Sequence, residues 1–286
     1  MANLNTWSDV SSIAQRIEHD AYFIVREMGV MQNLVTTFRD ATGMNLRRGY
    51  KYNAGTAQDI GDEDDLTSSS FTPSADQTLT PGEIGLQFFI TDARAESMLP
   101  EQIIADAARE LGFAALDRVE SDLQTDIASL TAGTIGTAGS TIAWGYMTDA
   151  IAQARNANKS ASVPLNAVIH GYQYAVLQKA SSIAASTQPA AISFVDEMTR
   201  KGFVRIFGGV PFYESYQTPI TGDDFIGGVF PINALAIDWR RPIRIEPERN
   251  ASRRGWEFNM SAIYAHGVWR PDLGVQFIFD ATAPTS

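Results

Sequence analysis

The side chains best suited to binding chemistry gather in two segments of the sequence. The first segment is acidic and contains Asp62, Glu63, Asp64 and Asp65, with Asp59 a few residues earlier. A group of carboxylates can bind Ca²⁺, but the order of these residues does not match the spacing of an EF-hand loop. They could instead pair with arginines, although the commonest role of such a run is a solvated, mobile tip.

The second segment lies near the end of the chain and mixes arginine with acidic residues. Its members are Arg240, Arg241, Arg244, Arg249, Arg253 and Arg254, together with Asp238, Glu246, Glu248 and Glu257. Only four of the 22 basic residues in the whole chain are lysine. Because a guanidinium group can bind a carboxylate with two parallel hydrogen bonds, this preference for arginine suits contacts in interfaces.

The residues that catalysis or metal binding requires are sparse. The three histidines, His19, His170 and His266, are far apart in the sequence, and there is neither a cysteine nor an H-E-x-x-H motif. The G-x-S-x-G motif of hydrolases and a lysine in a phosphate-binding loop are also missing. We therefore predict that the protein is not an enzyme and uses no cofactor or metal, while a site assembled from distant residues stays open.

The composition is that of a globular protein. The chain has 286 residues, of which 44% are hydrophobic and 19% charged, so it can bury the cores of two modest domains. Its net charge of −11 repels phosphate backbones, which argues against nucleic-acid binding as the main activity. The first residues lack the pattern of a signal peptide, and no apolar run approaches the ~18 residues of a membrane-spanning helix. We expect a soluble protein that is not secreted.

The charged segments must be held by helices and strands, and the strongest of these is a predicted helix from Pro100 to Leu130. Apolar residues recur there every three or four positions, which predicts one amphipathic helix of roughly 45 Å at about 1.5 Å per residue. They are Ile104, Ala107, Ala108, Leu111, Ala115, Val119, Leu123, Ile127 and Leu130. Gly112 lies inside this helix, where it costs roughly 0.5–1 kcal/mol relative to alanine. It can permit a bend, or it can allow a strand to pack closely.

Before this helix, the sequence predicts an amphipathic helix over residues 7–28 and a short strand over residues 34–38. Residues 47–53 and 85–91 are rich in aromatic and β-branched side chains and therefore predict two more strands. A long polar segment that contains the acidic residues lies between them. We expect these two strands to pair as a long, protruding hairpin with the acidic segment at its end.

After the long helix, Gly133, Gly136 and Gly139 do not match the dinucleotide-binding motif, and they predict a flexible linker at a domain boundary. An α/β unit follows. Its elements are helices over residues 147–157 and 172–182, a strand within 162–170, a short helix that could form over 194–200, and a strand, turn and strand over 202–215. From residue 234 the pattern is that of strands, so the whole chain predicts an α+β fold.

The order of these segments resembles that of the major capsid proteins of tailed bacteriophages of the Hong Kong 97 type. The resemblance begins with a helical arm, an acidic hairpin that ends QFFITDARAES, the helix LPEQIIADAARELGFAALDRVESDL and a glycine-rich joint. It continues with PLNAVIHGYQYAVL, the turn GGVPFYES and a terminal β section that begins ALAIDWRRPIRIE. No single motif is sharp, so the resemblance lies in the succession of segments along nearly the whole chain.

The resemblance implies a division of the chain into named regions. Residues 1–45 would form an N-terminal arm and residues 46–97 an extended β-hairpin loop. Residues 98–140 and 233–286 would form a peripheral domain with the long helix as its spine. Residues 141–232 would form an α/β axial domain.

The resemblance also implies the function of a structural major capsid protein. Copies would assemble as hexamers and pentamers into an icosahedral head shell that encloses double-stranded DNA, by way of a procapsid. The protein would enclose DNA without sequence-specific binding, contact no membrane, and become part of the virion capsid after assembly in the host cytoplasm. Because the arm begins almost at Met1, we expect a separate scaffolding protein as well as a portal protein, with decoration proteins as a further option.

Other functions compete with this interpretation. An encapsulin, which is a bacterial nanocompartment shell protein with the same fold, is the closest alternative. A phage decoration or tail protein and a hydrolase are more distant ones.

In a shell, we expect the two charged segments to meet across subunits. The predicted contact residues are Asp62, Glu63, Asp64 and Asp65 on one side and Arg240, Arg241, Arg253 and Arg254 on the other. The alternative is that these charges lie on solvated strand faces, where each pair contributes under about 1 kcal/mol. We also expect a neutral or acidic DNA-facing surface, because each basic contact would strengthen the retention of DNA.

Some relatives cross-link a loop lysine to an asparagine of a neighbouring subunit. Lys51 is the lysine of the predicted loop. Because the sequence identifies neither a matching asparagine nor a catalytic acid, we do not expect a cross-link.

Overall fold

The computed structural model describes residues 29–52, 55–62, 65, 68, 70–97, 100–160, 162–187, 206–216 and 223–283. The helices expected over residues 7–28 and 194–200 lie outside these ranges. The chain divides into two compact units, which are described separately. Unit 1 comprises residues 1–29, 83–119 and 241–263, and unit 2 comprises residues 30–82, 120–240 and 264–286.

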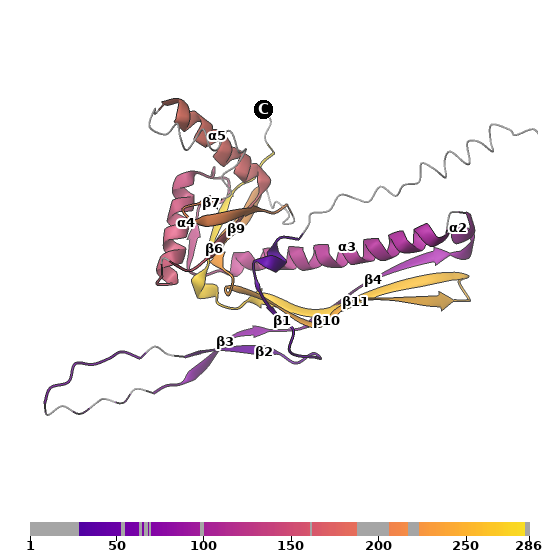
Figure 1. Cartoon of the computed structure of the whole chain (residues 1–286), viewed down its shortest axis with the longest axis horizontal. Helices are drawn as coiled ribbons and strands as arrows, with labels where there is room; N and C mark the ends of the chain where they lie inside the picture. The colour runs from indigo at the N-terminus through magenta and orange to yellow at the C-terminus, as the bar shows by residue number, and fades with distance from the viewer. Residues whose placement is uncertain are drawn as a thin grey trace, which may run out of the picture. The chain divides into compact units, whose positions relative to one another are not determined.

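Unit 1 contains a helix packed on long strands. Its elements are α2 (Asp92–Ser97), the first part of α3 (Pro100–Asp126), β4 (Gly82–Thr91), and parts of β10 (Leu235–Asn250) and β11 (Gly255–Val268). Figure 1 shows α3 beside these strands. The core brings Leu111 and Ala115 of the helix against Ile90, Phe258 and Met260 of the strands. Because residues four positions apart share a helix face, this contact is the one that the apolar periodicity predicts.

The predicted long helix is confirmed. α3 ends at Asp126, and the 3-10 turn η2 (Ile127–Ser129) completes the segment. From Leu111 onward, all the predicted apolar positions are at most 1% exposed: Leu111, Ala115, Val119, Leu123, Ile127 and Leu130. None of the helices in the described ranges is both long enough and apolar enough to cross a membrane.

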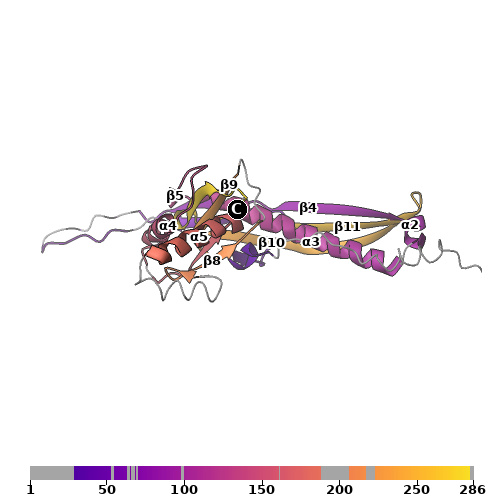
Figure 2. The same cartoon turned by 90° about the horizontal axis from the view of Figure 1, so that it is seen from above.

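Unit 2 is built on a six-stranded sheet in the order β5-β12-β9-β6-β8-β7. The strands are β5 (Gly133–Ile135), β6 (Leu165–Ile169), β7 (Ile206–Phe207), β8 (Val210–Glu214), β9 (Asp224–Pro231) and β12 (Val275–Asp280). β6 runs parallel to β8, and β9 is antiparallel to both β6 and β12. Helices α4 (Trp144–Ala157) and α5 (Gly171–Thr187) lie by this sheet (Figure 2). Met147 and Ile151 of α4 and Leu177 of α5 share a core with Val229 and Phe277 of the strands.

The remaining part of unit 2 consists of short elements, one of which pairs with the start of β10. It contains η1 (Met31–Asn33), β1 (Thr36–Phe38), β2 (Arg47–Tyr52), β3 (Pro73–Leu79) and η4 (Pro271–Leu273). β1 pairs with β10 in parallel, at one edge of a four-stranded sheet in the order β1-β10-β11-β4. Several predictions for unit 2 are confirmed: the two helices become α4 and α5, residues 162–170 contain β6, and Gly208 and Gly209 form the turn between β7 and β8 with φ of 57° and 79°.

The prediction for the hairpin was wrong in its second strand. β2 pairs with β3, whereas residues 85–91 belong to β4 and lie next to β11 in the other sheet. β3 has the sequence PSADQTL, which begins with proline and has no apolar alternation. Its last residue, Leu79, is buried against Ala236 and Ala265. A single buried apolar residue carries little periodic signal, so this segment was predicted as part of the polar loop.

The register of this hairpin changes once. Gly49 pairs with Gln77 and Tyr50 with Ala75, so one extra residue of β3 lies between these pairs as a bulge. At this point a Cβ on Gly49 would lie 3.1 Å from the Trp269 ring. The glycine therefore allows β2 to pass close to the indole.

The prediction of a flexible linker after the long helix was also wrong. Residues 133–135 form β5, which pairs in parallel with β12. Gly136 has φ of 79°, and a Cβ there would collide with Phe279 and with the carbonyl oxygen of Ile278. This glycine makes a tightly packed turn, because only a residue without a side chain combines that backbone angle with such close contacts.

Candidate functional site

The acidic segment of the hairpin is exposed. Asp59, Asp62 and Asp65 are all exposed, and none of the three forms an ion pair with the described residues. Glu63 and Asp64 lie outside the described ranges. Figure 1 shows the described part of this segment beyond the ends of β2 and β3. The negative charge is therefore available to another molecule.

Large apolar side chains are exposed on the same hairpin. Phe71 is 74% exposed, Ile60 57% and Tyr52 53%. The rings of Tyr52 and Phe71 stack with their centroids 4.8 Å apart and their planes within 6° of parallel. Such a group of exposed apolar side chains is typical of a surface that binds another protein.

A buried ion network lies at the base of the hairpin. Asp238 of β10 is fully buried and accepts hydrogen bonds at 2.7 Å from Nε of Arg47 and at the same distance from a terminal nitrogen of Arg240. Arg47 is the first residue of β2, and it also pairs with the exposed Asp40 and lies over the Phe38 ring at 4.4 Å. The network thus fastens the start of the hairpin to β1 and β10.

The charges of this network shift the pKa values of its members. The hydrogen bond from Arg47 holds the pKa of the Asp40 carboxyl below its usual value. The hydrogen bond to Asp238 raises the pKa of the Arg47 guanidinium, and this effect outweighs the opposing effect of burial. Both shifts favour the charged forms of Asp40 and Arg47.

Arg240, which was predicted to contact a neighbouring subunit, instead forms an ion pair within its own chain. Its side chain is only 4% exposed, and its partner is Asp238 of the same strand. The sequence contained a signal for this arrangement, because Asp238 directly follows the apolar run ALAI of a buried strand. A buried carboxylate requires a partner of opposite charge.

The other three predicted arginines lie in unit 1 and are more exposed. Arg241 pairs with Glu83, and Arg253 pairs with Glu257 at 3.1 Å while its guanidinium lies 4.1 Å from the centre of the Phe89 ring. Arg254 lies in the turn between β10 and β11 with φ of 50°. In the part of the chain that the structure describes, the Arg254 side chain forms no ion pair. Arg253 and Arg254 are thus the predicted arginines that a neighbour could best reach.

Close packing against other described residues does not explain why position 112 is a glycine, Gly112. A Cβ built on it meets no atom within 4 Å. The interpretation that a strand packs closely at this point therefore has no support, and the interpretation of a bend stays a prediction.

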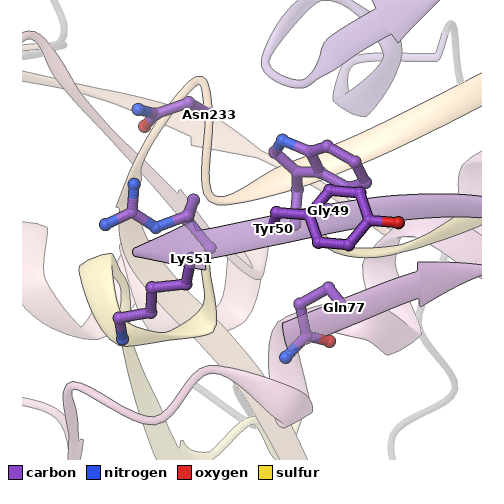
Figure 3. A pocket seen from close by; sticks show the side chains of 7 residues that line it. Gly49, Tyr50, Lys51, Gln77 and Asn233 are labelled. Carbon is purple, nitrogen blue, oxygen red and sulfur yellow. The ribbon is translucent and has the colours of Figure 1, made fainter. Parts of the chain in front are cut away.

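A cavity of about 190 Å³ lies beside the hairpin and was not foreseen from the sequence. Its walls come from four segments of unit 2: Gly49, Tyr50 and Lys51 of β2, Gln77 of β3, Asn233 of the turn before β10, and Trp269 and Arg270 after β11. Figure 3 shows the Lys51 and Tyr50 side chains around it, with Gln77 and Asn233 farther out. Lys51 and Arg270 both pair with Asp272, at 3.4 Å and 3.1 Å.

Two of the histidines lie in the described residues, and they have different surroundings. His170 is buried against the rings of Tyr172 and Phe225, and this burial lowers its pKa. His266 lies 2.9 Å from Asp126, whose pKa is raised by burial against the opposing effect of the histidine. No group of three or more potential metal ligands occurs within the described ranges.

The comparisons with known proteins point to one family. A model of the phage capsid protein family matches residues 75–275 of the chain. The head structure of Helicobacter pylori bacteriophage KHP40 is similar with a TM-score of 0.73 and 12% identity, over 99% of this chain and 99% of that chain. A structure from Mycobacterium phage Che8 has a TM-score of 0.69 and 17% identity, over 89% of this chain and 94% of that chain.

A virus-like particle from Pyrococcus furiosus has a TM-score of 0.52 and 11% identity, over 93% of this chain and 96% of that chain. A search of curated protein sequences finds no match. At these identities the solved structures establish the fold, while the family match covers well over half of the sequence. The chain therefore belongs to the phage capsid protein family and has the Hong Kong 97-type capsid fold.

Proposed function

We propose that copies of this phage head protein associate as hexamers and pentamers into an icosahedral shell around double-stranded DNA. The family match over residues 75–275 is the observation that carries the proposal. By the same family resemblance, a scaffolding protein and a portal protein take part in assembly, and decoration proteins are a further option. The shell holds DNA without reading its sequence, consistent with a chain of net charge −11.

In this proposal the chain keeps the regions that the resemblance implies. Residues 1–45 are the arm, 46–97 the extended loop, 98–140 and 233–286 the peripheral domain, and 141–232 the axial domain. The exposed hairpin of β2 and β3 supports the assignment of an extended loop that contacts a neighbour, because it carries Phe71 and Ile60 into solvent. Burying two such side chains favours association by about 1.5–3 kcal/mol each.

Ion pairs between copies add specificity to this contact. We propose that Arg253 and Arg254, and with them Arg241, pair with carboxylates of the acidic segment, Asp62 to Asp65, in a neighbouring copy. The exposure of Asp62 and Asp65 and the position of Arg254 in an exposed turn support this pairing. Arg240 contributes indirectly, because it holds the buried Asp238 in place.

The proposed role is structural and involves no catalysed reaction. An encapsulin-like shell has the weaker support, because the matching family model is that of phage capsid proteins. The possible bend at Gly112 belongs to the proposal as a point where α3 could change shape during maturation, since the glycine weakens the helix locally.

The test is to purify the protein and examine it by cryo-electron microscopy together with the variant Arg253→Glu/Arg254→Glu. We expect closed shells from the parent, and a folded chain that fails to form them from the variant. Lys159→Glu/Arg39→Glu makes the same change of charge at exposed positions outside both charged segments and should assemble normally. Normal assembly of the Arg253 and Arg254 variant would contradict the ion pairs, whereas a parent protein that stays monomeric at high concentration even with its scaffolding protein would contradict the shell itself.

A further inference from the structure

Two cationic side chains line the cavity beside the hairpin in an otherwise acidic protein. They are Lys51 and Arg270, and both pair with the Asp272 carboxylate. Burial raises the pKa of Asp272, but the hydrogen bond and charge of Arg270 and the charge of Lys51 outweigh it and hold that pKa below its usual value. Two cationic side chains at the wall of one cavity attract a carboxylate from another molecule.

The walls of this cavity are fixed before anything binds. The backbone amides of Trp269 and Arg270 both donate hydrogen bonds to the Ala234 carbonyl, at 2.8 and 3.0 Å. The Trp269 ring packs edge-on against Phe38 with centroids 5.3 Å apart, and Gly49 lies on its other side. A site that is already ordered loses little conformational entropy when it is filled.

The size of the cavity indicates what it can hold. Pockets for drug-sized ligands have volumes of about 300–1,000 Å³. A cavity of about 190 Å³ is smaller than these and fits one side chain. Its polar lining also includes the Gln77 and Asn233 amides, which can donate hydrogen bonds to a carboxylate.

The same hairpin carries exposed carboxylates of the required charge. Asp59, Asp62 and Asp65 are exposed and form no ion pair with the described part of the chain. They lie in the segment between the end of β2 at Tyr52 and the start of β3 at Pro73, while residues of both strands line the cavity. A contact from the carboxylates of one copy to the cavity of the next is heterologous, and a heterologous contact that closes on itself forms a ring.

We propose that the cavity lined by Lys51, Arg270 and Trp269 binds an acidic side chain from the hairpin of a second copy, one of Asp59, Asp62 and Asp65. The carboxylate pairs with Lys51, whose side chain is 48% exposed, and its methylene lies on the indole. This inference rests on the proposed shell. It adds a second receptor for the acidic segment, distinct from the turn that holds Arg253 and Arg254.

The first experiment is chemical cross-linking of lysine amines to the carboxylates that they contact. Shells are assembled from equal amounts of ¹⁴N- and ¹⁵N-labelled protein and treated with a water-soluble carbodiimide, and the linked peptides are identified by mass spectrometry. We expect Lys51 joined to Asp59, Asp62 or Asp65 in peptides that combine both labels. Links from Lys51 to these residues only within one label, or only to Asp272, would overturn the proposal.

The second experiment reverses the charge. Lys51→Glu should raise the protein concentration needed for assembly at least about tenfold. The further change Asp59→Lys, which leaves the carboxylates of Asp62 to Asp65 for Arg253 and Arg254, should restore at least part of this loss. Lys159→Glu, at an exposed lysine away from the cavity, should assemble like the parent, and circular dichroism shows whether each variant is folded. If Lys51→Glu assembles like Lys159→Glu, the cavity is not a receptor while the shell stands, whereas failure of the parent to assemble would refute the proposed function instead.

Discussion

Removing the Asp238 carboxylate should destabilise the protein strongly. This carboxylate is fully buried and bonded by two arginines at 2.7 Å, and the Arg240 side chain is 4% exposed. Asp238→Ala leaves that guanidinium buried without an anion, and removal of one partner from a buried ion pair costs about 3–5 kcal/mol. We expect a value near the lower end, about 3 kcal/mol, because Arg47 is partly exposed and keeps Asp40 as a partner.

The assay is urea denaturation of the unassembled chain, followed by tryptophan fluorescence, with the loss taken from the midpoint and the slope of the transition. Asp40→Ala serves as the matched control. It removes the other carboxylate from Arg47, but its side chain is 71% exposed, so we expect a much smaller loss than for Asp238→Ala.

A double variant identifies the cause of the loss. Replacing a buried ion pair by apolar residues of similar volume is often neutral, so Asp238→Leu/Arg240→Met should recover most of the stability lost in Asp238→Ala. If Asp238→Ala costs no more than Asp40→Ala, the buried network does not stabilise the fold. If the double variant is as unstable as the single one, the penalty does not come from an uncompensated charge.

Three further predictions concern glycines and pH. Gly112→Ala should raise the free energy of unfolding by about 0.5–1 kcal/mol in thermal denaturation, because a Cβ there meets no atom within 4 Å, and shells that then assemble and expand normally would exclude a hinge at this point. Gly227→Ala should instead lower it by about 1–3 kcal/mol, because its Cβ would collide with the Val168 carbonyl and the Phe277 ring; an unchanged midpoint would show that β9 can move aside. The folded-state pKa of Asp272 is lowered below 3.8, so its stabilising effect is present above that pH and lost as the pH falls through the lowered pKa. Asp272→Asn should therefore be less stable than the parent at pH 6 and approach it at pH 2 to 3, and a difference that stays constant with pH would contradict the ion pairs.

The parts of the fold that could be predicted from sequence are those with a strong local signal. From Leu111 onward α3 buries one face, and its apolar residues repeat there at the helical period. The turn at Gly208 and Gly209 was predictable because two successive residues with positive φ favour glycine. β3 gave no such signal, because its sequence PSADQTL has no apolar alternation and only its last residue, Leu79, is a large apolar residue.

The candidate sites were less predictable because their partners come from distant segments. The apolar run before Asp238 indicated a buried carboxylate that needs a cationic partner, but the sequence did not identify which of the many arginines that partner would be. The cavity combines four separate segments, and its charge depends on Asp272, which lies outside both charged segments. Likewise, the contact of His266 with Asp126 joins residues 140 positions apart.

The bulge in the hairpin affects the register of the whole pair of strands β2 and β3. A slip of one residue in a strand pair moves every later position by about 3.3 Å and turns each side chain to the opposite face. Here the bulge between Gly49 and Tyr50, the close approach of Gly49 to the Trp269 ring and the buried Leu79 at the end of β3 all disfavour such a slip. Every copy of the chain then starts its acidic segment from the same strand register, and such uniformity is what a structure made of identical parts requires.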